Sequence, residues 1–249
     1  MSALKLRGIG HAYLGRTVLD AVDLAVAPGE VVALVGPSGS GKSTLVHIAA
    51  GIVDPLRGST TRSYACHGMV FQEPRLMPWA TAADNIAYPL RLAGVPRTMR
   101  RKRVLVAAEK VALSLEDFGK FPIELSGGMR QRVAIARALV VEPDFVFFDE
   151  PFTALDQALK RRMQDLVIAA AAERAFAALF ITHDLIEAVR IAHRIVVLDL
   201  NGRGIAGERP LPGTPGFRED RDVFETVQRF LNGDSLFCHI NDVDERKVA

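Results

Sequence analysis

The chain has 249 residues, of which 49% are hydrophobic, and its 31 Lys+Arg against 29 Asp+Glu give a formal net charge of +2. This length allows one large domain with a subdomain. Because the net charge is close to zero, the chain as a whole provides no electrostatic attraction for nucleic acid or anionic lipid. The first residues lack the apolar core of a signal peptide, and no apolar run approaches the roughly 18 to 20 residues of a membrane span. The two cysteines, Cys66 and Cys238, lack a spacing typical of a metal site. We therefore expect a soluble cytoplasmic protein, unless a partner carries it to a membrane.

The first informative elements are an apolar strand at 31–35, a glycine-rich loop and a helix that follows it. The loop at 36–44 reads Gly-Pro-Ser-Gly-Ser-Gly-Lys-Ser-Thr and fits the pattern G-x-x-x-x-G-K-[ST]. Glycines let backbone N–H groups turn toward a phosphate, and the helix N-terminus adds a favourable dipole. A ligand-free glycine turn is the alternative, which the flanking strand and helix disfavour. We predict a nucleoside triphosphate site made of Gly36, Pro37, Ser38, Gly39, Ser40, Gly41, Lys42, Ser43 and Thr44.

Within this site two side chains have separate predicted roles. Lys42 reaches the β- and γ-phosphates, and the Ser43 hydroxyl completes the shell of a Mg²⁺ ion. ATP and Mg²⁺ are therefore the expected ligands.

Further along the chain, residues 54–61 form a broken polar stretch, and a short strand at 68–71 ends at Gln72. Thr81 is predicted to cap a helix running towards Leu92. The remaining predicted elements are a helix at 96–113, a helix opened by Gly127, and strands at 145–148, 177–181 and 194–198, with helices before the last two.

This alternation of apolar strands and helices argues for a buried, mostly parallel sheet. The helix-rich section at about 80–141 interrupts it and is predicted to be an inserted subdomain. We place a single domain at 1–233 and a polar tail at 234–249.

The apolar strand at 145–148 leads directly into Asp149 and Glu150. A buried strand that delivers one carboxylate to a metal and a second to an attacking water is what a triphosphatase needs. Asp149 is thus a candidate Mg²⁺ ligand and Glu150 a candidate general base. Strand ends often carry acids, so the pair alone is weak evidence for a catalytic role. Its position after the phosphate loop is what supports that role.

A second candidate anion site precedes the helix at 127. Ser126, Gly127 and Gly128 offer a hydroxyl and unencumbered backbone N–H groups at a helix N-terminus. The plain alternative is an N-cap serine with two permissive glycines. If the site completes the phosphate loop of a partner across a two-fold axis, two phosphate sites in one chain are not redundant.

The octapeptide at 125–132, Leu-Ser-Gly-Gly-Met-Arg-Gln-Arg, resembles the signature motif of the ATP-binding cassette (ABC) family, with Met129 where glutamine is commoner. The resemblance extends from Tyr13 to about Leu198 in the family's motif order. It implies an α/β fold, in which a P-loop NTPase core with a mostly parallel sheet has an N-terminal antiparallel β edge and an inserted helical subdomain. The segment between Gly58 and Gln72 is about ten residues shorter than in most relatives, so we expect a trimmed antiparallel edge.

The resemblance also implies roles for single residues. Tyr13 would stack on adenine, Gln72 would join Mg²⁺ and the lytic water to a membrane partner, and His183 would touch the γ-phosphate. A core aromatic and a structural histidine are the alternatives for Tyr13 and His183. Asp156 matches the D-loop, which communicates across the dimer. The catalytic residues that the resemblance implies are Glu150, His183, Gln72 and Lys42. The implied metal ligands are Ser43, Gln72 and Asp149. The implied contacts with the ATP bound by the partner chain come from Ser126, Gly127, Gly128 and Asp156.

As a member of this family the chain would be the ATPase of a bacterial importer, paired as a homodimer or with another cassette beneath membrane permease subunits. It would lie on the cytoplasmic face of the inner membrane, would be served indirectly by a periplasmic binding protein, and would not bind nucleic acid. The segment at 70–79 resembles the nitrate, sulfonate and taurine branch, and thiamine-precursor importers share similar segments. The sequence leaves the solute open, together with the permease and the role of the tail.

Other readings remain at this point. Two other functions remain as alternatives: a non-transport cassette that acts in translation or DNA repair, and an ATP sensor that does not hydrolyse ATP. Trp79 is either packed for stability or in contact with a partner. The cations at 97–103 form either a solvated helix face or a contact with the membrane partner or acidic headgroups.

Overall fold

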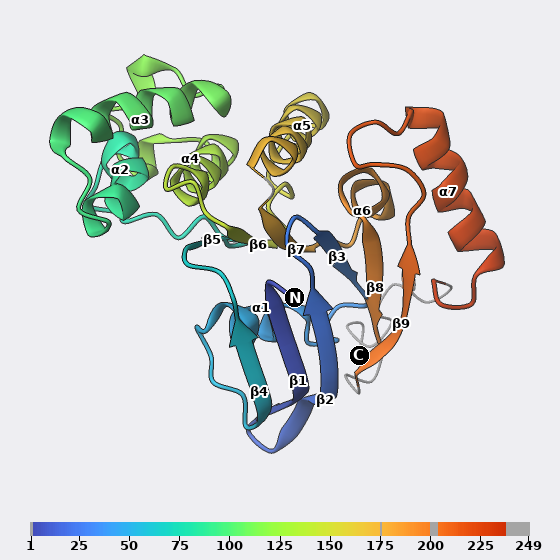
Figure 1. The fold of residues 1–249 in the computed structure, drawn as a ribbon. Helices are drawn as coiled ribbons and strands as arrows, with labels where there is room; N and C mark the ends of the chain where they lie inside the picture. The colour runs from blue at the N-terminus through green and yellow to red at the C-terminus, as the bar shows by residue number, and fades with distance from the viewer. Residues whose placement is uncertain (1, 175, 200–203, 238–249) are drawn as a thin grey trace, which may run out of the picture. The chain divides into compact units, whose positions relative to one another are not determined.

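The computed structural model describes residues 2–174, 176–199 and 204–237. Its contacts divide the chain into two units, Met1–Tyr64 with Ala177–Ala249, and Ala65–Phe176. Figure 1 labels the elements of both. Among the described residues, no helix combines the length and the apolar character needed to cross a bilayer.

The first unit opens with a three-stranded antiparallel sheet in the order β2-β1-β4. Its strands are β1 (Leu4–Tyr13), β2 (Arg16–Val26) and β4 (Arg57–Arg62). Strand β4 was not expected, because the polar sequence at 54–61 has no apolar alternation. The structure explains this: the residues of β4 are almost all exposed, and backbone pairing with β1 holds them in place. The expected antiparallel edge is thus present.

The same unit contains strands in the order β7-β3-β8-β9, of which the first three are parallel and β9 is antiparallel to β8. All five residues of β3 and all five of β7 are buried, as continuous apolar runs in a parallel sheet require. Strands β7 and β8 have the bounds predicted from the sequence, whereas β9 and α7 were missed. The elements of this part are β3 (Val31–Val35), β7 (Ala177–Ile181), β8 (Arg194–Leu198), β9 (Ile205–Pro210), α1 (Lys42–Ala50), α6 (Leu185–Ile191) and α7 (Asp220–Gly233).

The second unit combines two parallel strands with helices, of which α2, α3 and α4 form a cluster in Figure 1. Thr81 caps α2 as predicted, accepting the N–H of Asp84 at 3.2 Å. The elements are β5 (His67–Val70), β6 (Phe145–Asp149), α2 (Ala82–Leu92), α3 (Arg97–Lys110), α4 (Gly127–Leu139), α5 (Gln157–Arg174) and the short 3₁₀ turns η1 (Leu115–Asp117) and η2 (Pro122–Glu124). The domain boundaries at 80–141 and 1–233 stay predictions, and most of the predicted tail lies outside the described residues.

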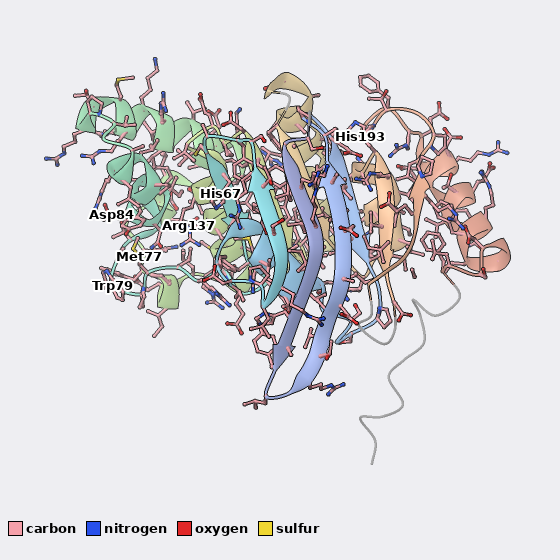
Figure 2. All side chains as sticks on the ribbon, turned by 60° about the horizontal axis from the view of Figure 1, so that its bottom comes forward. His67, Met77, Trp79, Asp84, Arg137 and His193 are labelled. Carbon is pink, nitrogen blue, oxygen red and sulfur yellow. The ribbon has the colours of Figure 1, made fainter. Side chains whose placement is uncertain are left out.

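One partly buried contact at the start of β3 involves a histidine whose pKa is shifted. The N–H of Val31 donates to Nδ1 of His193 at 3.0 Å, and Figure 2 labels this histidine. Burial lowers the pKa of His193 below its ordinary value of 6.5, and Glu30 partly opposes this. The neutral imidazole is therefore the form that the folded chain holds.

We expect acid to destabilise the fold through this group. Because the folded pKa is depressed, the unfolded chain binds the proton more readily once the pH falls below about 6.5, and the free energy of unfolding drops until the folded pKa is passed. Chemical denaturation between pH 8 and 5 should show a smaller drop for His193→Gln than for the wild type. Parallel curves for the two proteins would contradict this role.

Candidate functional site

The phosphate loop connects β3 to α1 in a backbone form that only glycine adopts easily. Gly41 has φ 91°, and a Cβ placed there would lie 2.8 Å from the Leu19 side chain and 2.9 Å from the Val18 carbonyl oxygen. Gly39 also has a positive φ, of 82°. The motif glycines are therefore required by geometry as well as by the approach of a ligand.

The same loop presents donors suited to an anion. Gly41 is the N-cap of α1 without a side-chain cap, and the first turn of the helix contains no acidic residue. The Ser40 hydroxyl is buried and has no hydrogen-bond partner in the part of the chain that the structure describes. Lys42 turns back on the loop, with Nζ 2.7 Å from the Gly36 oxygen and 2.8 Å from the Pro37 oxygen. These features fit a polyphosphate, which needs several converging donors.

Tyr13 and His183 belong to the same unit as the phosphate loop. Tyr13 ends β1 and is 48% exposed, so the alternative of a core aromatic is wrong. His183 follows β7, which pairs in parallel with β3, and so it leaves the sheet at the same edge as the phosphate loop. Asp184 accepts the N–H groups of Ile186 and Glu187 and thereby caps α6 beside the exposed histidine.

The acidic pair lies at the end of β6 in the second unit. Asp149 is 4% exposed, and Glu150 follows it with φ 44°, a strained conformation for a glutamate. Gln72 Nε2 lies 3.5 Å from Glu150 Oε2, and the hydroxyl of Thr153 lies 3.5 Å from the same oxygen. The structure thus brings Gln72 and Glu150 together, as a water-positioning pair requires.

The signature residues form the N-terminus of α4. Ser126 is the N-cap and accepts the N–H of Met129 at 3.2 Å, so the plain capping role is present. Its side chain is nevertheless exposed, and the first turn carries no acid. A Cβ on Gly128 would lie 3.5 Å from Leu155 and 3.6 Å from the Ala154 oxygen, so the residues just before Asp156 are next to the signature. This end of α4 remains open to an anion from outside the chain.

Asp156, the predicted D-loop contact, has a visible local role. Its Oδ1 accepts the N–H of Leu159 at 2.9 Å at the start of α5. The side chain is exposed, so capping and contact with a second chain are compatible.

Three polar residues whose structural roles were not predicted from the sequence hold the segment on either side of Gln72. Arg137 donates to the carbonyl oxygens of Pro74 at 2.8 Å and Arg75 at 2.9 Å, and burial lowers its pKa. The amide of Gln131 donates to the Phe71 oxygen at 3.3 Å. The side chain of Asn85 is fully buried and bonds to both the N–H and the oxygen of Met77. Polar residues on the apolar faces of two helices were the signal that could have revealed them.

The anchored segment ends in an exposed aromatic side chain. Trp79 is 77% exposed, which excludes the alternative of a packed tryptophan; Figure 2 shows it near Met77 at the outer end of this segment. Tryptophan is enriched at protein interfaces, so a fixed backbone that presents an indole to solvent is compatible with the predicted contact with a partner.

The predicted metal ligands are a hydroxyl, an amide and a carboxylate, the hard oxygen donors that Mg²⁺ prefers. Ser43 lies in the first unit, and Gln72 and Asp149 lie in the second. No cluster of three or more histidine, cysteine or acidic side chains that could hold a metal ion occurs within the described ranges. The chemistry of the hydroxyl, amide and carboxylate oxygens is what fits magnesium.

Comparisons with known proteins find the family that the motifs resemble. The family model described as ABC transporter matches residues 19–153. The chain is 43% identical over 230 residues to an aliphatic sulfonates import ATP-binding protein, SsuB, of Mycobacterium sp. (strain MCS), covering 89% of this chain and 92% of that one. It is 41% identical to SsuB 1 of Pseudomonas syringae pv. syringae, with 94% and 95% covered. A dimeric post-hydrolysis structure of the ATP-binding cassette MJ0796 bound to ADP and Pi superposes with a TM-score of 0.78 at 32% identity, covering 84% of this chain and 99% of that one.

Proposed function

Because the chain belongs to the ABC transporter family, we propose that it is the ATP-hydrolysing subunit of a bacterial importer for organosulfur anions of the aliphatic sulfonate type. The observation that carries the proposal is identity of about 40% over nine-tenths of the chain to several proteins named for sulfonate import. At the motif level, the phosphate loop, the acidic pair and the signature all have side chains suited to ATP hydrolysis. An ATP sensor without turnover would not need Glu150 and His183, so we do not favour it.

In the proposed mechanism the loop N–H groups, the Ser40 hydroxyl and Lys42 bind the phosphates of ATP. Ser43, Asp149 and Gln72 would hold Mg²⁺, which neutralises charge on the phosphates when it is bound. Glu150 accepts a proton from the attacking water, and Gln72 orients that water beside it. His183 donates a hydrogen bond to the γ-phosphate, and Tyr13 stacks on adenine.

We also infer which partners the chain binds and where in the cell it lies. Two cassettes pair so that Ser126, Gly127 and Gly128 of one protomer complete the phosphate site of the other, with Asp156 near the contact. The exposed Trp79 and the anchored segment behind it would contact a membrane permease and hold the subunit at the cytoplasmic face of the membrane. A periplasmic binding protein would supply the solute to the permease.

Growth on defined sulfur sources tests this function. We expect a strain that lacks the gene to grow normally on sulfate and to lose growth on alkanesulfonates as sole sulfur source, with uptake of labelled sulfonate reduced at least about tenfold. The wild-type gene should restore both, and a Lys42→Ala gene should restore neither. Unchanged growth and uptake on sulfonates, with loss of nitrate or taurine uptake, would reassign the solute. Normal uptake of all three would contradict the import proposal.

A further inference from the structure

A cavity in the second unit is lined by none of the residues assigned above to ATP chemistry. Its volume is about 460 Å³, within the range of roughly 300 to 1,000 Å³ for small-molecule sites. Its walls come from α3, the C-terminal half of α4 and the C-terminal half of α5, which all belong to one unit. Leu139, Val140, Leu166 and Phe176 are among its apolar lining residues.

Chain geometry separates this cavity from the acidic pair and the signature. Pro143, which lines it, precedes β6, whereas Asp149 ends that strand about 15 Å further on. Leu139 is the last residue of α4, a helix of 13 residues and thus roughly 20 Å long, which begins after Ser126. A ligand here would contact the ends of α4 and α5 that lie farthest along these helices from the signature and from Asp156.

The charges around the cavity are divided between its walls. Lys102, Arg103 and Lys110 line it from α3, and none of the three has a hydrogen bond or ion pair among the described residues. Glu142 and Glu173 line it from the loop after α4 and from the end of α5. Helix α3 as a whole contains six cations and one acid, namely Arg97, Arg100, Arg101, Lys102, Arg103, Lys110 and Glu109. Three of these cations therefore line the cavity from α3, two glutamates line it from elsewhere, and most of the other lining residues are apolar.

We propose that this cavity binds an amphiphilic organic anion, with its alkyl body among the apolar residues and its acidic head beside the three cations of α3. Removing the alkyl chain from water favours binding into an apolar cavity. An anionic head gains charge-assisted hydrogen bonds from lysine and arginine that otherwise point to solvent. Alkyl sulfonates and alkanoates share this chemistry, so an imported solute and a lipid-derived acid are the two possible sources.

Calorimetric titration of the full chain tests the proposal directly. Decyl sulfonate, kept below its micelle concentration, should bind saturably with one site per chain. Decanoate should also bind, whereas decyltrimethylammonium and an uncharged decyl glycoside should bind at least about tenfold more weakly. Tighter binding of the sulfonate would identify an organosulfur source, and tighter binding of the alkanoate would identify a lipid-derived one. Absence of saturable binding by both anions overturns the proposal.

Two charge-reversal pairs on α3 locate the site. Lys102→Glu with Lys110→Glu reverses two lining residues, and Arg97→Glu with Arg101→Glu reverses two exposed residues of the same helix that do not line the cavity. We expect the first pair to weaken decyl sulfonate at least about tenfold and the second less than about twofold. Equal weakening by the two pairs would mean that general attraction to α3, and not the cavity, binds the anion.

A measurement on the wild-type protein tests the proposal without depending on whether the variants fold. In methyl-labelled protein, decyl sulfonate should shift the NMR signals of Leu139, Val140 and Leu166 and leave those of Val31 and Leu34 in β3 unchanged. Shifts confined to other methyl groups would overturn the proposal. These experiments measure binding constants and methyl shifts, so their outcome does not depend on whether the chain hydrolyses ATP or serves sulfonate import.

Discussion

Glu150→Gln should bind ATP with near wild-type affinity and hydrolyse it at least about 100-fold more slowly. Glutamine has almost the same shape, so the contacts with Gln72 at 3.5 Å and with Thr153 at 3.5 Å can be kept. An amide cannot accept the proton of an attacking water at neutral pH, and removal of a general base commonly slows a reaction by about 10² to 10⁴. Bound but uncleaved ATP should also keep two protomers together, which light scattering would detect as a stable dimer.

Glu116→Gln is the matched control for this experiment. Glu116 is an exposed glutamate in η1, a different segment of the same unit. Steady-state ATPase rates and binding of a fluorescent ATP analogue should be unchanged in this variant. If Glu150→Gln hydrolyses ATP at near the wild-type rate, the general base has been assigned to the wrong residue.

Mixing Lys42→Ala chains with Ser126→Arg chains should restore activity that neither has alone. In a mixed dimer, the intact phosphate loop of the second chain meets the intact signature of the first, and the opposite site carries both defects. Random pairing makes about half of the dimers mixed, so we expect roughly a quarter of wild-type activity if the sites act independently. Each parent should retain less than about one per cent, because phosphate contacts act mainly in the transition state.

Ser114→Arg separates the signature role from helix capping. Ser114 caps η1 through the N–H of Glu116 at 3.3 Å, much as Ser126 caps α4 through Met129 at 3.2 Å. Loss of either cap costs about 1 kcal/mol of stability, yet only Ser126→Arg should abolish hydrolysis. Native mass spectrometry must show that mixed dimers form. If they form and remain inactive, the two chains do not share their sites.

The sequence was informative where chemistry depends on neighbouring residues. The phosphate loop, the acidic pair and the signature each lie within a few consecutive positions. The apolar runs beside the phosphate loop and the acidic pair predicted β3 and β6, and two further apolar runs predicted β7 and β8. Capping of α2 by Thr81 followed from the same local logic, because a cap acts on N–H groups within one turn.

By itself, then, the sequence determined the family's motif order, the α/β class and the candidate ATP-binding and catalytic residues. Only the tertiary structure decided that the polar residues of β4 form a strand, since pairing with β1 supplies what their side chains do not. It also decided that Arg137 and Gln131 hold the segment on either side of Gln72, and that α3, α4 and α5 line a cavity. These features join residues about 25 to 65 positions apart, and the local pattern of a sequence does not show which distant residues meet.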